Sequence, residues 1–128
     1  MLEVFIPLNP EFRLYEAQAK ELFEKNQEKI CDPNPFSFIV NNTLFYLFVL
    51  DGTFIGAIYY FMDKGRLFLN GYAIPKNYNA NMLSLRQSTK WFKKPIYAEA
   101  QNRASALCLL RCGFRRVDGN LFCLEKDV

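Results

Sequence analysis

Three consecutive segments rich in Phe, Tyr, Ile and Val constrain the fold of this chain more than any other feature. They cover residues 44–50, 53–62 and 66–74, and short turn sequences, Asp-Gly at 51–52 and Asp-Lys-Gly at 63–65, separate them. Turns of this kind join the strands of hairpins. Because parallel strands need much longer crossover connections, the three segments are expected to form an antiparallel meander.

Two further strands and a helix are predicted before this meander. Residues 36–41 have a similar apolar composition and end at a turn-forming Asn-Asn pair, and residues 3–7 can form a short strand. Between them, apolar side chains recur at helical spacing, which predicts one amphipathic helix over residues 10–30. Pro33 and Pro35 end this helix, because proline cannot continue it.

The last third of the chain is predicted to contain a helix, a strand, a second helix and a hairpin. A helix with basic residues on its outer face covers roughly 80–93, and a strand follows at 96–100. Asn102 is expected to cap the second helix. Gly113 ends it, since glycine suits the position just after a helix C-terminus. The final segment is predicted to form a hairpin around residues 118–120.

This order of elements predicts an α/β fold, or α+β in stricter terms, with a mixed, mainly antiparallel central sheet flanked by helices. The chain has 128 residues, of which 51% are hydrophobic and 16% aromatic, so it has enough apolar material for a substantial core. We expect residues 1–128 to form one domain. Because we find neither a signal peptide nor an apolar run of membrane-spanning length, we expect a cytoplasmic protein without a membrane partner.

Histidine is absent from the sequence. This excludes Ser-His-Asp and Cys-His catalysis and any zinc site built on imidazole. Four cysteines are present, but the long apolar sequence around them is unlike a small disulfide scaffold, and Cys108 and Cys112 are too few for a four-ligand metal site. We expect reduced, partly buried thiols and no bound metal, since no base lies near these cysteines in the sequence.

Residues 96–124 carry the most specific pattern in the chain. Asn102 is followed by Ser105 three positions later and by Gly113 and Phe114 at eleven and twelve positions, and a predicted hairpin comes next. This pattern resembles the fifth strand and following helix of the GNAT superfamily of acetyl-coenzyme-A-dependent N-acetyltransferases, and the order of elements along nearly the whole chain is similar to that family. The resemblance implies a GNAT, or acyl-CoA N-acyltransferase, fold and acetyl-CoA as cofactor.

In that family, the helix after the fourth strand begins with a glycine-containing loop that approaches the coenzyme pyrophosphate. Residues 74–83 occupy this place. The resemblance implies coenzyme contacts by Ile74, Lys76, Asn79, Ala80, Asn81, Asn102 and Ser105. The chain departs from the family pattern, because Tyr78 stands where Arg or Gln is usual and Asn81 and Leu83 stand where small residues are usual. Side chains at the last two places crowd the phosphates, which approach most closely where a Cβ is missing.

The chain departs from the family at both of its usual catalytic groups. Many members use a tyrosine in the helix after the fifth strand to reprotonate the coenzyme thiolate, and Leu109 stands at that place. The usual base is a carboxylate on the fourth strand, where this chain offers Asn70 and Tyr72. The candidates for a catalytic role are therefore Glu99, Tyr72 and Tyr78. Strand alternation also allows Glu99 to be a plain solvent-facing side chain.

Positive charge is concentrated in residues 76–116. Nine basic residues lie there against one acidic residue, Glu99, although the net charge of the chain is only +3. Such a face attracts coenzyme phosphates, nucleic acid or an acidic protein partner, or it is simply a solvated helix surface.

Three functions remain open from the sequence. The first is a divergent N-acetyltransferase that transfers an acetyl group from acetyl-CoA to an amine or protein acceptor. The second is a catalytically inactive GNAT-fold protein with a structural or interaction role, similar to short GNAT-like phage proteins, including virion components. The third is a basic nucleic-acid-associated protein. If Tyr78 or Leu83 fills the space between the fourth and fifth strands, the coenzyme site is closed.

Overall fold

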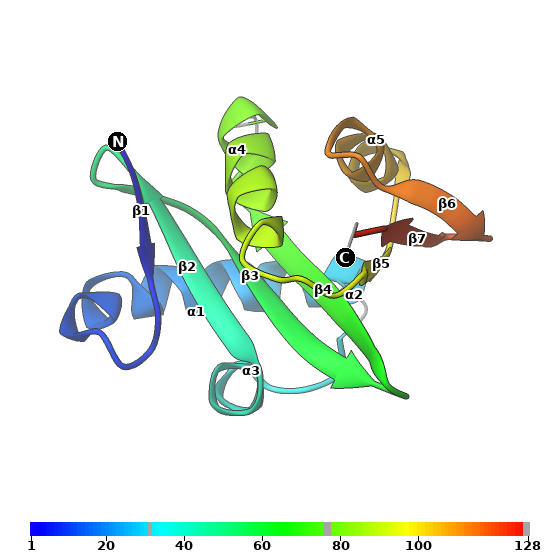
Figure 1. The fold of residues 1–128 in the computed structure, drawn as a ribbon. Coiled ribbons are helices and arrows are strands. Elements are labelled where there is room, and N and C mark those ends of the chain that lie inside the picture. The colour runs from blue at the N-terminus through cyan, green and yellow to red at the C-terminus, as the bar shows by residue number, and fades with distance from the viewer. Residues whose placement is uncertain (31, 76–77, 127–128) are drawn as a thin grey trace.

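A computed structural model describes residues 1–30, 32–75 and 78–126. Its strands are β1 (Leu2–Phe5), β2 (Leu44–Leu50), β3 (Thr53–Asp63), β4 (Arg66–Ala73), β5 (Ile96–Glu99), β6 (Arg115–Asp118) and β7 (Leu121–Leu124). They form one sheet in the order β1-β2-β3-β4-β5-β7-β6 (Figure 1). Neighbouring strands are antiparallel except for β4 and β5, which are parallel. The predicted mixed, mainly antiparallel sheet is therefore confirmed.

Helices cover both faces of this sheet. They are the 3-10 helix η1 (Pro10–Leu14), α1 (Glu16–Lys25), α2 (Gln27–Ile30), α3 (Phe36–Asn42), α4 (Tyr78–Thr89) and α5 (Arg103–Arg111). One apolar core joins the sheet to α1, α2 and α3, and a second core joins the other face to α4 and α5 (Figure 1). None of the helices in the described part of the chain combines the length and apolar character needed to cross a lipid bilayer.

The predicted meander corresponds to β2, β3 and β4. Leu50 pairs with Thr53, and Asp63 pairs with Arg66, so both turns are as short as the sequence indicated. Gly52 and Gly65 each have a φ of 80°, a backbone conformation that glycine adopts readily and other residues rarely do. The residues of the two turns therefore determine where these strands begin and end.

The prediction of a strand over residues 36–41 is wrong, because this segment forms α3. A strand would have placed Phe36, Phe38 and Val40 on one face. Instead Phe36, Ile39 and Val40 are buried at helical spacing, and Phe38 is 46% exposed. Pro35 stands at the N-cap in an extended conformation, where it does not interrupt the helix.

The prediction of one continuous helix over residues 10–30 is also wrong. The segment divides into η1, α1 and α2, and Asn26 forms the break between the last two. Its backbone leaves helical geometry at φ −110° and ψ 9°, and its side-chain Nδ2 donates a 2.8 Å hydrogen bond to the Leu22 carbonyl oxygen. Asparagine favours such local side-chain bonds, which compete with the helix.

The remaining elements agree with the sequence apart from their boundaries. The first strand ends at Phe5, and the helix predicted over 80–93 covers Tyr78–Thr89. The predicted strand at 96–100 and the terminal hairpin are confirmed as β5 and as the β6–β7 pair. Asn102 caps α5 as expected, and Gly113 has the positive φ of 95° expected after a helix end.

The parallel strands β4 and β5 touch over a short distance and then separate. Their register contains Leu67 opposite Ile96 and Phe68 opposite Tyr97. Beyond these pairs, β4 stays paired with β3 as far as Ala73, and β5 stays paired with β7. Each strand thus follows its other neighbour, and one edge of β4 is left without a strand partner. This gap in the sheet positions the candidate site.

Candidate functional site

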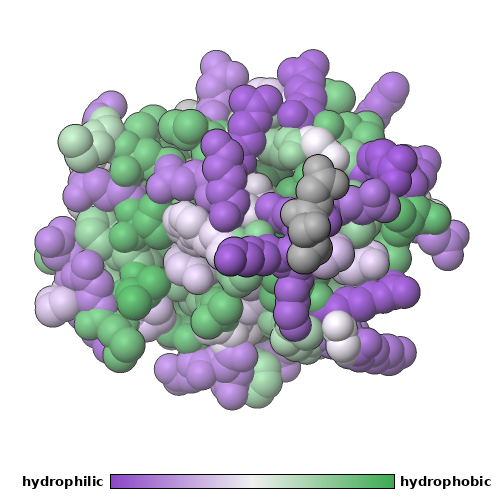
Figure 2. Space-filling view, in the orientation of Figure 1, coloured by the Kyte–Doolittle hydropathy of each residue, from purple (hydrophilic) through white to green (hydrophobic). Residues whose placement is uncertain are grey.

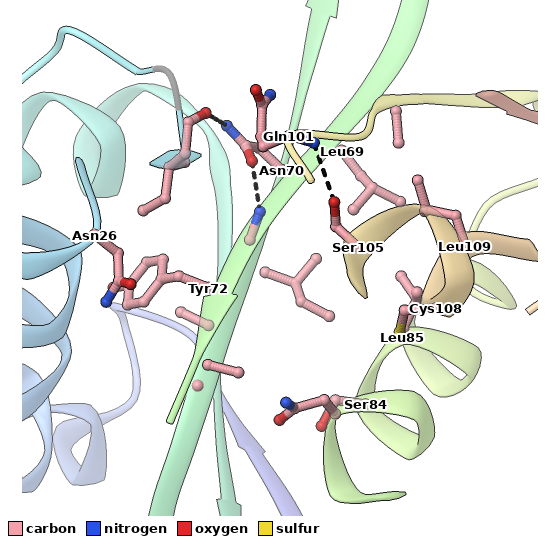
Figure 3. A pocket seen from close by; sticks show the side chains of 18 of the residues that line it. Asn26, Leu69, Asn70, Tyr72, Ser84, Leu85, Gln101, Ser105, Cys108 and Leu109 are labelled. Carbon is pink, nitrogen blue, oxygen red and sulfur yellow. Dashed lines mark hydrogen bonds between the residues drawn. The ribbon is translucent and has the colours of Figure 1, made fainter. Parts of the chain in front are cut away.

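A cavity of about 360 Å³ lies where β4 and β5 separate. Figure 3 shows β4 passing between two walls of this cavity. Asn26 and Tyr72 lie on the side of α1, and Ser105, Cys108 and Leu109 of α5 lie on the other side. Because the edge of β4 that faces β5 has no strand neighbour here, the cavity reaches residues of both helical layers.

Asn70 and Gly71 organise the open edge of β4. The Gly71 backbone N–H donates a 2.9 Å hydrogen bond to Oδ1 of Asn70 rather than to a strand. Asn70 Nδ2 in turn donates to the Ile30 carbonyl oxygen at 3.1 Å (Figure 3). In an antiparallel strand, alternate residues point their peptide groups to the same edge, so Ala73 shares this orientation with Gly71. The cavity is therefore bordered by the part of the β4 edge that lies beyond its pairing with β5.

The N-terminus of α5 is fixed by a capping box at the edge of the cavity. The Ser105 N–H donates to Asn102 Oδ1 at 2.8 Å, and the Asn102 N–H donates to Ser105 Oγ at 3.1 Å. The Gln101 N–H also donates to Ser105 Oγ, at 3.0 Å. These reciprocal bonds satisfy amides that a helix start otherwise leaves free. They hold the first turn of α5 rigidly against the gap in the sheet.

A second cavity of about 250 Å³ adjoins the first one. The two share five residues in their walls: Ile30, Leu69, Asn70, Glu99 and Gln101. The carboxylate side chains lining the second cavity are Asp32, Asp63 and Glu99. Its lining, among the described residues, contains no lysine or arginine. The second cavity therefore favours positively charged groups.

The hydroxyl groups of Tyr59, Tyr60 and Tyr72 have defined partners. In that order these partners are Asp32 Oδ2 at 2.8 Å, Ser88 Oγ at 2.7 Å and the Ala19 carbonyl oxygen at 2.8 Å. Burial raises the pKa of all three tyrosines well above its ordinary value, and Asp32 adds to the rise at Tyr59. These hydroxyls are therefore protonated at neutral pH and occupied by structural bonds.

Comparison with solved structures finds acetyltransferases of one fold. An aminoglycoside acetyltransferase in complex with coenzyme A is 10% identical over 96% of this chain and 94% of that chain, with a TM-score of 0.65. An N-acetyltransferase from Thermoplasma acidophilum in complex with coenzyme A is 17% identical over 100% and 99% of the two chains, with a TM-score of 0.59. A GNAT family acetyltransferase from Brucella melitensis in complex with acetyl-CoA is 14% identical over 98% and 88%, with a TM-score of 0.56. The chain has the GNAT fold. No protein-family model matches the sequence, and no curated protein matches it either.

This GNAT fold confirms the architecture that the sequence pattern in residues 96–124 predicted. Likeness at this level of identity establishes the fold and leaves the activity to be argued from the residues of the chain. Some of the residues that the resemblance implies as coenzyme contacts border the first cavity. Asn81, Asn102 and Ser105 line it.

The other implied coenzyme contacts lie outside its lining. Ile74 follows β4, and its N–H donates a 2.9 Å hydrogen bond to the Ile55 carbonyl oxygen. Ala80 is buried and Asn79 is exposed in the first turn of α4. Lys76 lies outside the described residues.

Neither Tyr78 nor Leu83 closes the gap between β4 and β5. Leu83 is 47% exposed and does not line the cavity. Tyr78 lines the cavity, yet it is 36% exposed and its ring lies under the Arg111 guanidinium, 5.5 Å from it. Tyr78 is therefore held at the mouth by a cation–π contact and leaves the interior open.

The three candidates for a catalytic role occupy different environments. Glu99 is exposed at the end of β5 and lines both cavities. Tyr72 lines the first cavity with its hydroxyl bound to Ala19, and Tyr78 lies at the mouth. Leu109, at the place of the family's proton donor, lines the cavity and is 5% exposed. Glu99 is thus the candidate that combines an ionisable group with access to both spaces.

The basic residues of the second half form an exposed surface over α4, α5 and the following hairpin. Hydrophilic side chains project from the edge of the molecule that α4 and α5 form (Figure 2). The exposed basic residues are Arg86, Lys90, Lys93, Lys94, Arg103, Arg111, Arg115 and Arg116. Within the described ranges, Arg115 is the one of these with an ion pair, to Glu125 at 3.1 Å. This surface is contiguous with the mouth of the cavity at Arg111 and Tyr78.

Several residues of the site escaped sequence reasoning. Asn26, Ser84 and Gln101 line the cavity although no motif indicated them. Asn70 carried a usable signal, because Asn followed by Gly inside an otherwise apolar strand is unusual. Cys108 was interpreted as an inert thiol, yet it also lines the cavity. No group of three or more His, Cys, Asp or Glu side chains within the described ranges is arranged to hold a metal ion.

Proposed function

We propose that this chain is an N-acetyltransferase that transfers an acetyl group from acetyl-CoA to a cationic amine, with residues 1–128 acting as one GNAT-fold unit in the cytoplasm. The observation that carries the proposal is the pair of adjoining cavities at the gap between β4 and β5. One is bordered by an edge of β4 without a strand partner, and the other is lined by carboxylates. Two substrates that must meet need two such spaces with a shared boundary.

The first cavity fits the amide-bearing arm of coenzyme A. An open strand edge binds an extended ligand through peptide groups, as in strand addition, and the edge of β4 beyond Phe68 has no strand partner. Residues of the first turns of α4 and α5 line the cavity, and the exposed Arg111 lies over Tyr78 of this lining, where positive charge suits phosphates. The bound coenzyme supplies an acetyl thioester, which is activated for transfer to an amine.

The second cavity fits the acceptor. Alkyl ammonium groups have a pKa near that of lysine, about 10.4, so an amine arrives charged and must lose a proton before it can attack. Asp32 and Asp63 attract the cation, while Glu99 stands at the boundary with the first cavity. Its carboxylate is the group in this chain placed to accept that proton, directly or through water.

The leaving thiolate of the coenzyme must take up a proton, and α5 lacks the tyrosine that donates this proton in many family members. Leu109 has no proton to donate, and the buried tyrosine hydroxyls are bound to Asp32, Ser88 and the Ala19 carbonyl. We infer that water entering the open cavity mouth performs this step. The rate then rests mainly on positioning by the β4 edge and on Glu99.

An assay for free thiol release tests this function. Wild-type protein is incubated with acetyl-CoA and a panel of amines that includes a neutral aromatic amine, a monoamine and a polyamine. The proposal expects turnover with the cationic amines, greatest for the polyamine because three carboxylates line the second cavity. Thiol release that no amine stimulates contradicts the proposal.

The inactive GNAT-fold alternative is supported by Leu109, which has no proton to donate, and by Tyr72, whose hydroxyl in the cavity wall is bound to the Ala19 carbonyl oxygen. This alternative predicts no acceptor-dependent turnover, whether or not the coenzyme binds. Binding without turnover across the whole panel therefore favours this alternative over the transferase.

A further inference from the structure

Two thiols on α5 form a cluster that the proposed transferase reaction does not use. Cys108 and Cys112 lie one helical turn apart, and Cys112 is the residue that caps the C-terminus of α5. Residues four positions apart at the end of a helix lie on the same face, so the two side chains are neighbours, and both are partly exposed. Exposed thiols that face each other can react with small molecules and then with one another.

Arg86 brings positive charge to this pair from α4. Its Nη2 donates a 3.2 Å hydrogen bond to the Arg111 carbonyl oxygen, which holds the guanidinium at the end of α5 beside Cys112. The other side of the Cys112 sulfur faces Met82, at 4.0 Å from its carbonyl oxygen and 3.9 Å from its Sδ. The sequence alone does not indicate Arg86 as a neighbour of Cys112, because Arg86 is distant along the chain and close to the end of α5 only in the fold.

The two thiols have different pKa values. The neighbouring Cys108 thiol and the charge of Arg86 lower the pKa of Cys112 to about 7, against the effect of burial. The Cys112 thiol, together with burial, raises the pKa of Cys108. A thiol with a pKa near the ambient pH is the most effective attacking group in thiol–disulfide exchange, so Cys112 suits attack and Cys108 suits the later step.

We propose that Cys112 and Cys108 form a reactive thiol pair, in which Cys112 attacks low-molecular-weight disulfides and Cys108 resolves the product. The inference goes beyond the proposed transferase activity and does not depend on it. In the first step, the Cys112 thiolate attacks one sulfur of a disulfide RSSR, forms a mixed disulfide and releases RS⁻. In the second, Cys108 loses its proton to solvent, attacks the Cys112 sulfur and releases the second RS⁻. Both released thiolates take up protons, so RSSR is reduced to two RSH while the two cysteines are oxidised to one disulfide.

The end of α5 allows this disulfide to close. Four residues of an α-helix rise about 6 Å, within the range of Cα separations that disulfides span. The side chains must come closer than in a regular helix. Cys112 already has the non-helical ψ of 8°, and Gly113 follows with a φ of 95°, so the last residue can rotate while the interior turns stay intact. Because Cys108 lines the first cavity, closure also moves part of the cavity wall.

Mass spectrometry of the full chain tests this pair. The protein carries Cys31→Ser, so that the measured thiols are those the structure describes, and it is incubated at neutral pH with coenzyme A disulfide or with glutathione disulfide. We expect a Cys108–Cys112 disulfide in this protein. When Cys108→Ser is added, we expect the reaction to stop at the mixed disulfide on Cys112. Cys112→Ser is expected to react roughly tenfold more slowly, because its thiolate is lost.

Two further variants control for general effects. Cys123→Ser removes a thiol that is 4% exposed, and it is expected to change nothing. Arg86→Met is expected to slow the reaction and to move the midpoint of its pH profile upward, which a structural role alone does not do. Faster reaction with coenzyme A disulfide than with glutathione disulfide identifies the cavity as the source of recognition, and equal rates identify a general disulfide sensor. The proposal is overturned if Cys112 reacts no faster than Cys123, or if Arg86→Met leaves both rate and midpoint unchanged.

Discussion

The side-chain Nδ2 of Asn70 donates a 3.1 Å hydrogen bond to the carbonyl oxygen of Ile30, and this bond ties the open edge of β4 to the end of α2. Both residues line both cavities, so the bond crosses the boundary that the two cavities share. Oδ1 of the same side chain accepts from the Gly71 N–H. One polar residue inside an apolar strand thus holds the centre of the site.

Replacing this residue is expected to weaken the fold moderately. Asn70→Ala removes two hydrogen bonds of a partly buried amide, and the free energy of unfolding should fall by about 1–3 kcal/mol. Urea unfolding measures the change. Asn42→Ala is the matched control, because it removes an exposed 2.9 Å bond from Nδ2 to the Phe38 carbonyl oxygen. A loss at Asn70 no larger than at Asn42 contradicts the role assigned to Asn70.

The helical conformation of residues 36–42 is tested by a pair of neighbouring variants. Ile39 is 2% exposed in α3, so Ile39→Ala should destabilise the protein by about 2–5 kcal/mol. Phe38 points outward, and Phe38→Ala should change stability by about 0.5 kcal/mol or less. Thermal or urea unfolding gives both values. The reverse order of effects would support the strand pattern instead.

Alkaline pH is expected to destabilise the protein through its buried tyrosines. Their pKa values are raised in the folded state, so above about pH 10 the unfolded chain releases protons that the folded chain retains. Stability is therefore complete below pH 10 and declines as the pH rises further, by about 1.4 kcal/mol per pH unit for each such tyrosine. Tyr72→Phe should reduce the slope of this decline by the contribution of one tyrosine, about 1.4 kcal/mol per pH unit. Parallel curves for the two proteins, measured by urea unfolding across this range, would show that Tyr72 is not held protonated.

Glu99 and Asp63 are expected to affect the proposed reaction differently. Glu99→Gln removes the proposed proton acceptor, so kcat with a cationic amine should fall by about 100-fold while coenzyme affinity is unchanged. Asp63→Asn removes charge from the second cavity, so KM for the amine should rise with little effect on kcat. Steady-state kinetics separates the two. Glu21→Gln on α1 changes a carboxylate that lines neither cavity, and it serves as a control with unchanged kinetics.

The sequence predicted those parts of the fold that depend on local chemistry. Turn residues fixed the boundaries of the meander, and Asn102 and Gly113 fixed the ends of α5. The segment at 36–42 could not be assigned from composition, because Phe, Ile and Val suit a strand and a buried helix face equally. The break at Asn26 depends on a side-chain bond to its own helix, which helical spacing alone does not reveal.

The site was harder to predict because it arises from distant segments. The gap between β4 and β5 follows from two strands each staying paired with another neighbour, which no local pattern encodes. The second cavity brings Asp32, Asp63 and Glu99 together from separate elements. Likewise, Arg86 reaches the end of α5 only through the packing of α4. Family resemblance indicated Asn81, Asn102 and Ser105, which line the first cavity, whereas the second cavity and the thiol pair required the structure.

Calorimetric titration with acetyl-CoA tests the central claim, that the gap between β4 and β5 holds the coenzyme. Asn81 lines the first cavity from α4, and Leu83 lies two residues away on the same helix but outside its lining. Asn81→Trp should therefore fill the mouth and weaken binding by at least about tenfold, or 1.4 kcal/mol, while Leu83→Trp leaves it unchanged. The account predicts micromolar binding by wild-type protein and by Leu83→Trp. No detectable binding by wild-type protein at millimolar coenzyme, or equal binding by all three proteins, would contradict it.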